Sequence, residues 1–234
     1  MCIGYDLKLL GRVEHANIWR IVMFIGHFAV AFLLMWLFPN VNPLVPLIGV
    51  SFPDLLWPFL VFSGVEKLTV NPDSPLQKDL VFLSYPFSHS LVMGTLVASG
   101  FGLVLGLLLG ALSGVVFVLA SASHWVLDIL VHMKDLPVTG MRNDRKVGLG
   151  LWGRPRLAFI LEYLFYGAMT LLFVPSSQIM AILVLGGVFH LINSNSFLGF
   201  TRRNPTRTSR AYAGLALFGF SAFIVTFILV TENL

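Results

Sequence analysis

The sequence predicts an all-α, polytopic membrane protein, because apolar residues are abundant, charges are rare and the apolar stretches are long. Apolar residues make up 57% of the chain and charged residues 11%, whereas soluble domains have about 45–50% and about 25%. A surface with so few charges must face lipid rather than water. A helix of about 20 apolar residues is long enough to cross the hydrocarbon of a bilayer.

Seven such stretches predict a bundle of seven transmembrane helices in one domain, residues 1–234. The predicted spans are 19–38, 44–64, 80–106, 110–133, 156–174, 179–199 and 211–230. The apolar run 80–133 is too long for one span. We therefore expect a turn in its glycine-rich middle, at Gly106, Gly110 and Gly114.

The segments outside the spans are short. Residues 1–18 mix leucines with charges and are expected to lie in the cytoplasm or along the membrane surface. Residues 134–155 form a basic cytoplasmic loop between the four helices of 19–133, which carry the candidate site, and the three helices of 156–234.

The basic residues predict the orientation of the chain. Of the 15 Lys and Arg, three lie before or at the start of the first span, and two, six and four lie in the second, fourth and sixth loops. The positive-inside rule therefore predicts a cytoplasmic N-terminus and a C-terminus outside. Because insertion explains the net charge of +4, no nucleic-acid partner is expected.

Six ionisable side chains stand out within the predicted spans, where each costs about 2.5–3.5 kcal/mol. They are His27, Asp54, His89, His124, Asp128 and Glu162. His124 and Asp128 are four residues apart and share one helix face, which His132 and Asp135 extend. That face cannot point to lipid, so we expect it to point into the bundle.

At about 1.5 Å per residue from the nearest cytoplasmic charge, Asp128, Glu162 and His27 lie about 9–10 Å deep, His89 and His124 lie about 15 Å deep, and Asp54 lies mid-span. We therefore expect these residues to converge on one layer in the cytoplasmic half of the bilayer. Imidazole and carboxylate are ligands of zinc, and also of manganese and iron. The sequence therefore predicts a divalent metal site, zinc being favoured. Its candidate ligands are His27, Asp54, His89, His124 and Asp128.

Metal binding beside buried carboxylates suggests hydrolysis. A bound zinc ion lowers the pKa of its water to about 7 and supplies hydroxide at neutral pH. Asp54 and Glu162 are the candidate catalytic residues, Glu162 as a general base or as the group that orients a ligand histidine. A membrane lipid or another amphiphile is the expected substrate, because no soluble substrate domain is present.

Other interpretations of the same residues stay open. Intramembrane His and Asp also relay protons or hold ions in transporters and channels. A metal with four closed protein ligands is structural rather than catalytic. A single membrane histidine can also simply hydrogen-bond a neighbouring helix.

Four short segments contain the candidate ligands. They are GHFAVAF around His27, FPDLLW around Asp54, YPFSHS around His89, and SHWVLD around His124 and Asp128. In their motifs, order and spacing, these segments resemble the YdjM-like membrane-bound metal-dependent hydrolases of bacteria. The resemblance covers about the first 155 residues, including KVGLGLW after the fourth span. It implies a protein of the cytoplasmic (inner) membrane with these five residues as metal ligands.

The chain departs from that family at two places. Family members often carry a His-Arg pair ahead of a central THS, and a second acid after the PD. Tyr85 and Pro86 stand in the place of the pair, and Leu56 stands in the place of the acid. These departures argue against a second metal ion.

Overall fold

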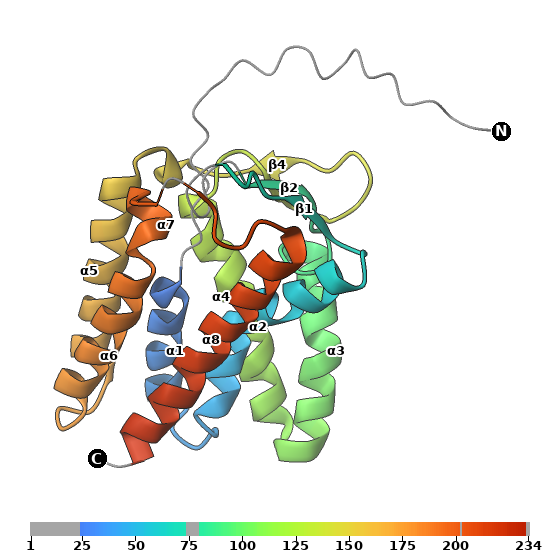
Figure 1. Ribbon diagram of the computed structural model, residues 1–234. Helices are drawn as coiled ribbons and strands as arrows, with labels where there is room; N and C mark the ends of the chain where they lie inside the picture. The colour runs from blue at the N-terminus through green and yellow to red at the C-terminus, as the bar shows by residue number, and fades with distance from the viewer. Residues whose placement is uncertain (1–23, 74–79, 202, 233–234) are drawn as a thin grey trace, which may run out of the picture.

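The computed structural model describes residues 24–73, 80–201 and 203–232, and it is mostly helical (Figure 1). The α-helices are α1 (Ile25–Leu37), α2 (Leu44–Phe62), α3 (Leu91–Leu109), α4 (Ala111–Val131), α5 (Pro155–Phe173), α6 (Ile179–Ile192), α7 (Ser194–Leu198) and α8 (Ser209–Glu232). A short 3₁₀ helix, η2 (Leu151–Gly153), precedes α5. Two small antiparallel ladders pair β1 (Lys67–Thr69) with β2 (Val81–Ser84) and β3 (Leu136–Pro137) with β4 (Lys146–Val147).

The helices confirm a membrane protein built from several apolar spans. Among the described residues, α2, α3, α4, α5 and α8 are long and apolar enough to cross a bilayer. Helices α1 and α6 are apolar but shorter, with 13 and 14 residues. The count of seven spans and the direction of the termini stay predictions, and the interfacial segment predicted at 1–18 lies outside the described residues.

Two predicted spans are wrong at one end. The span 80–106 starts too early, because residues 81–84 form strand β2 and α3 begins only at Leu91. The sequence VFLS is apolar in a strand as well as in a helix, so hydropathy alone could not separate them. The span 179–199 is divided, since α6 ends at Ile192 and α7 follows as a separate short helix.

The predicted glycine turn is present, and it lies at Gly110. This residue has a φ of +92° and joins α3 directly to α4. Gly114 instead lets the two helices approach closely, because a Cβ added there would lie 2.3 Å from the carbonyl oxygen of Gly102. The turn therefore needs the conformational freedom of glycine, whereas the helix contact needs its small size.

Helix α2 lies at the centre of the bundle, where it packs against α1, α4 and α8. The contact between α2 and α4 is close at Gly49, since a Cβ added to Gly49 would lie 2.6 Å from Cβ of Ala120. Asp54 follows Gly49 by five residues and His124 follows Ala120 by four. The close contact therefore brings these two polar side chains to neighbouring positions one turn further along.

One end of the bundle carries the strands and the loops. Figure 1 shows β1, β2 and β4 at the same end, opposite the turn between α3 and α4. The start of α8 joins this end, because the hydroxyl of Ser209 donates a hydrogen bond to the carbonyl of Leu68 in β1. The described Lys and Arg residues belong to the segments that meet here, namely β1, residues 134–156 and residues 203–210.

The loop after β4 closes the C-terminal end of α4. The backbone N–H of Leu149 donates to the carbonyl of Ile129, and that of Gly150 donates to the carbonyl of His132. Gly148, which directly precedes these two donors, has a φ of +152°. A Cβ added there would lie 1.8 Å from the carbonyl oxygen of Met133. The loop therefore satisfies the last carbonyls of α4 only because Gly148 has no side chain.

Replacing Gly148 with alanine is expected to lower the free energy of unfolding by at least about 2 kcal/mol, because the added Cβ displaces the loop from α4. Gly100→Ala in α3 is the matched control, since its added Cβ meets nothing within 4 Å and alanine is favoured in a helix. Denaturation in detergent micelles, followed by circular dichroism, measures both. Equal stability of the two variants would contradict the contact.

Candidate metal centre

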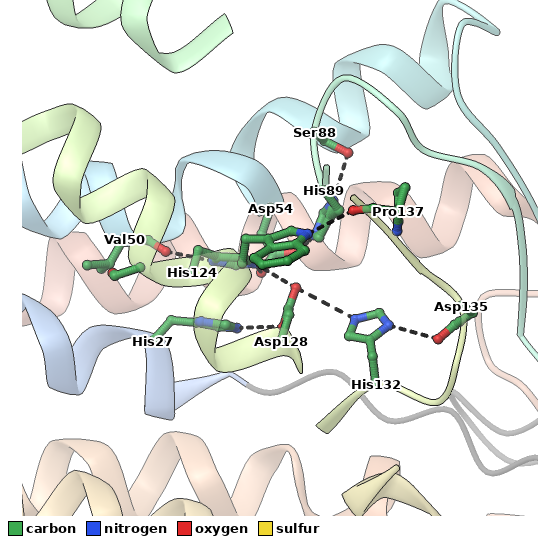
Figure 2. A network of polar contacts seen from close by, with 12 residues as sticks. His27, Val50, Asp54, Ser88, His89, His124, Asp128, His132, Asp135 and Pro137 are labelled. Carbon is green, nitrogen blue, oxygen red and sulfur yellow. Dashed lines mark hydrogen bonds and ion pairs between the residues drawn. The ribbon is translucent and has the colours of Figure 1, made fainter. Parts of the chain in front are cut away.

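The five predicted ligands lie together inside the bundle (Figure 2). His27 comes from α1, Asp54 from α2, and His124 and Asp128 from α4, while His89 lies just before α3. All five side chains are buried. The structure therefore brings together residues that are up to 101 positions apart in the sequence, counted from His27 to Asp128.

The ligand atoms surround one small space. His124 Nε2 lies 3.5 Å from Asp54 Oδ2 and 3.5 Å from Asp128 Oδ2. His27 Nε2 lies 3.5 Å from Asp128 Oδ1, and His89 Nε2 lies 3.2 Å from Asp54 Oδ1. Two atoms that each lie about 2.0–2.1 Å from a tetrahedral zinc ion are about 3.3–3.4 Å apart. The observed separations therefore match the spacing of zinc ligands.

The outer contacts of His124 orient its ring for metal binding. Its Nδ1 lies 2.7 Å from the carbonyl oxygen of Val50, and a carbonyl can only accept. We therefore assign the ring proton of neutral His124 to Nδ1, which leaves the lone pair of Nε2 facing Asp54 and Asp128. A histidine that donates one ring N–H to a carbonyl and offers the other nitrogen is the usual arrangement of a metal ligand.

His132 extends the site toward the loop end. Its Nδ1 lies 3.2 Å from Asp135 Oδ1 and its Nε2 lies 3.6 Å from Asp128 Oδ2. The ring packs on Trp152, with centroids 4.0 Å apart. The helix spacing predicted that His132 shares a face with Asp128, and the structure adds that it lies beside the candidate ligands.

Several buried polar atoms of the site have no hydrogen-bond partner among the described residues. They are both ring nitrogens of His27, Nε2 of His124, Oδ2 of Asp54 and Oδ2 of Asp128. A buried polar group without a partner costs about 1–3 kcal/mol, so a cluster of such atoms is suited to bind a cation or a water molecule. The described residues can hold a metal ion here, in two overlapping groups that share His124.

A small cavity adjoins these atoms. The centre of a water molecule can move through about 20 Å³ of it, and a single water needs about 10–15 Å³. Its polar walls are Asp54, His89, His124, Asp128 and His132, and its other walls are mainly aromatic: Trp57, Phe82, Tyr85, Trp152 and Tyr212. The space suits an ion with a bound water, next to an apolar wall.

Glu162 does not line this cavity. Its Oε1 accepts the backbone N–H groups of Phe24 and Gly26 at 2.6 and 3.0 Å, at the start of α1. Its Oε2 lies 3.8 Å from Nδ1 of His190. The carboxylate therefore anchors the N-terminus of the helix that carries His27. Its predicted catalytic role stays a prediction.

Sequence reasoning missed Glu66 and Ser88. Both oxygens of the Glu66 carboxylate bind the segment before α3, since Oε1 accepts the N–H groups of Phe87 and Ser88 and Oε2 accepts the hydroxyl of Ser88. Ser88 in turn contacts Nδ1 of His89. Burial raises the pKa of the Glu66 carboxyl above its ordinary value, and the donors on Ser88 and Phe87 oppose that rise. No helix periodicity could have found Glu66, because it lies between α2 and β1.

No family model, curated protein or solved structure matches the chain. The resemblance to the YdjM-like hydrolases therefore stays a prediction.

Glu162→Ala is expected to lower the free energy of unfolding by about 2 kcal/mol or more, because two buried N–H groups lose their acceptor. Glu162→Gln keeps an acceptor oxygen and should cost less than half as much. Glu232→Ala, at an exposed position near the end of α8, is the control and should have no effect. Denaturation in micelles measures the three variants. Equal losses for Ala and Gln would contradict the anchoring role.

Proposed function

We propose that the protein is a membrane-embedded, metal-dependent hydrolase whose ligands are His27, Asp54, His89, His124 and Asp128. The observation that carries the proposal is the position of His124 Nε2, which lies 3.5 Å from an oxygen of each carboxylate and has no hydrogen-bond partner among the described residues, while Nδ1 contacts the carbonyl of Val50. Acceptors that face one another in a buried site repel, and a cation between them turns the repulsion into ligation.

Charge balance supports a divalent ion. Asp54 and Asp128 are buried, and no Lys or Arg of the described residues forms an ion pair with either. Two buried carboxylates whose partners are neutral histidines are costly inside a membrane protein. One divalent ion neutralises both carboxylates and leaves the histidines neutral, as metal ligation requires.

A single ion accounts for the donor set better than two. The two overlapping groups of candidate ligands share His124, and its Nδ1 is occupied by Val50. Only the lone pair of Nε2 is left, and one lone pair binds one ion. Three imidazoles and two carboxylates favour zinc, with manganese and iron as the alternatives.

The chemistry proposed for the site is hydrolysis. Bound zinc supplies a water of lowered pKa and polarises the scissile bond. Asp54 lies on the cavity wall and is the proposed acceptor for the proton of the attacking water. Glu162 acts through α1 in this scheme, because it anchors the helix that holds His27.

The proposed substrate is a membrane lipid or another amphiphile, with an ester, phosphoester or amide bond. Two features support it. The cavity has an aromatic wall beside its polar one, and such walls bind apolar ligand parts. Phe82 of β2 and Trp152 of η2 also line the cavity, which places it near the end of the bundle that carries the strands and the described basic residues.

That end is the proposed cytoplasmic face, by the positive-inside rule. The finer topology belongs to the same proposal: seven spans in the cytoplasmic (inner) membrane, with the N-terminus inside and the C-terminus outside. No part of the scheme involves nucleic acid.

A proton- or ion-coupled transporter is the second candidate, and one observation favours it. The polar contacts form a chain from His27 through Asp128 and His132 to Asp135, whose side chain is 15% exposed. Such chains relay protons in pumps. On the other side of His27, however, the core of α1 is apolar, with Phe28 and Phe32 fully buried. Residue-dependent proton or ion flux in proteoliposomes, without hydrolysis, would establish transport instead.

Protein purified without chelators is expected to contain about one zinc, manganese or iron ion per chain. The reason is that the two groups of candidate ligands share His124, which has only Nε2 free to bind an ion. His124→Ala and Asp128→Ala should lose that ion. His190→Ala is the matched control, since His190 is equally buried but contacts Phe159 and Glu162. Elemental analysis measures the metal content. Absence of stoichiometric metal from the unmutated protein would sink the proposal.

Metal removal is expected to abolish hydrolysis of a fluorogenic amphiphilic ester, phosphoester or amide by the protein in lipid vesicles, and added zinc should restore it. Asp54→Asn should lower kcat by about 10²–10⁴-fold, the range of general-base catalysis. Asp144→Asn, in the loop between β3 and β4, is the control and should retain full activity, since asparagine keeps an oxygen for the N–H groups of Thr139 and Gly140. Retained turnover by the metal-free protein would contradict the role of the ion.

A further inference from the structure

The β1–β2 hairpin ends beside His89. Glu66 directly precedes β1, and Ser88 follows β2 by four residues. Because the strands pair antiparallel, with Lys67 opposite Ser84, the two ends of the hairpin lie next to each other. Glu66 and Ser88 are both buried, at 1% and 3% exposure. They therefore form a contact at the base of the hairpin, between the loop end and the candidate metal ligand.

The hydrogen bonds at this base have a defined direction. Glu66 Oε1 accepts two backbone N–H groups, and the hydroxyl of Ser88 lies 2.6 Å from Oε2. A serine has only one hydroxyl proton, and Ser88 donates it in the hydrogen bond to the Glu66 carboxylate. The Ser88 oxygen can then only accept from Nδ1 of His89, which lies 2.7 Å away. The ring proton of His89 is therefore on Nδ1, and the lone pair of Nε2 faces Asp54.

We propose that Glu66 and Ser88 are positioning residues, which hold His89 in the tautomer that offers Nε2 to the metal. The relay runs from the Glu66 carboxylate through the Ser88 hydroxyl to the His89 ring. It has the same effect as the carboxylate–histidine pairs around metal sites, with a hydroxyl inserted. The proposal deepens the metal site proposed above. The effect on metal binding rests on that site, whereas the position of the ring proton on His89 does not require a metal.

This role gives the hairpin a function in a protein whose other described ligands come from helices. His27, Asp54, His124 and Asp128 are held by the backbones of α1, α2 and α4. His89 lies in the loop before α3, where no helix orients it. The relay supplies that orientation from the hairpin instead.

Two variants test the relay. Ser88→Ala removes the hydroxyl and leaves the Ser88 N–H bonded to Glu66, so the metal Kd should rise by about 10–100-fold, the usual cost of an outer partner. Glu66→Gln keeps an oxygen for the two N–H groups but presents an NH₂ to Ser88. The hydroxyl must then donate to His89 Nδ1, which moves the ring proton to Nε2 and blocks ligation. Its effect on Kd should equal or exceed that of Ser88→Ala.

The controls separate positioning from folding. Ser88→Thr keeps the hydroxyl and should bind metal within about threefold of the unmutated protein. Ser113→Ala removes another buried hydroxyl, which donates to Leu109 in the α3–α4 turn, and should not change the Kd. Chelator competition with zinc measures the Kd of each variant. A Ser88→Ala variant that binds zinc as tightly as the unmutated protein, or as tightly as Ser88→Thr does, would overturn the proposal.

The tautomer is measured directly in the metal-free protein. In ¹⁵N-histidine-labelled protein at alkaline pH, the His89 signals, assigned with a His89→Gln variant, should show the proton on Nδ1. In Glu66→Gln they should show it on Nε2. An Nε2–H tautomer in the unmutated protein overturns the relay even if zinc binds. An Nδ1–H tautomer in a protein that binds no metal supports the relay and rejects the metal site, so the two failures are distinguishable.

Discussion

The structure depends on two carboxylates, Asp54 and Asp128, that are buried together among imidazoles and have no Lys or Arg partner among the described residues. In lipid or protein interior, such a pair is stable only with a compensating charge. The residues around the carboxylates orient the histidines toward them. Val50 and Ser88 occupy the Nδ1 atoms of two histidines, so that the Nε2 atoms converge on the carboxylates.

The convergence requires close backbone contacts elsewhere. Gly49 lets α2 reach α4 near Ala120, and Gly148 lets the loop after β4 reach the end of α4. Glu162 holds the first turn of α1. These residues contact no candidate ligand atom, yet each sets the position of a helix that carries one. The precision of the site is therefore built from helix termini and helix contacts rather than from the ligands alone.

Much of this arrangement was predictable from the sequence, because membrane helices leave a strong signal. The apolar runs located the main helices, and the spacing of His124 and Asp128 predicted one polar helix face. Ionisable residues in a bilayer are so costly that His27, Asp54 and His89 were identifiable as partners.

Periodicity could not show the contacts that are made outside helices. The hydropathy of VFLS predicts a helix, but these residues form strand β2. The position of Glu66 between elements predicts an exposed loop charge, but its side chain is buried against Ser88. Glu162 was expected in the site because of its depth, whereas its Oε1 binds the backbone at the start of α1.

Helix α8 carries none of the candidate ligands, yet it completes the cavity. Tyr212 and Ala216 form part of the wall, and Ser209 ties the start of the helix to β1. The ligands all precede residue 129, so the ligand set and this wall belong to separate stretches of the gene. Substitutions in α8 can therefore diversify what the cavity admits without altering the residues proposed to bind the ion.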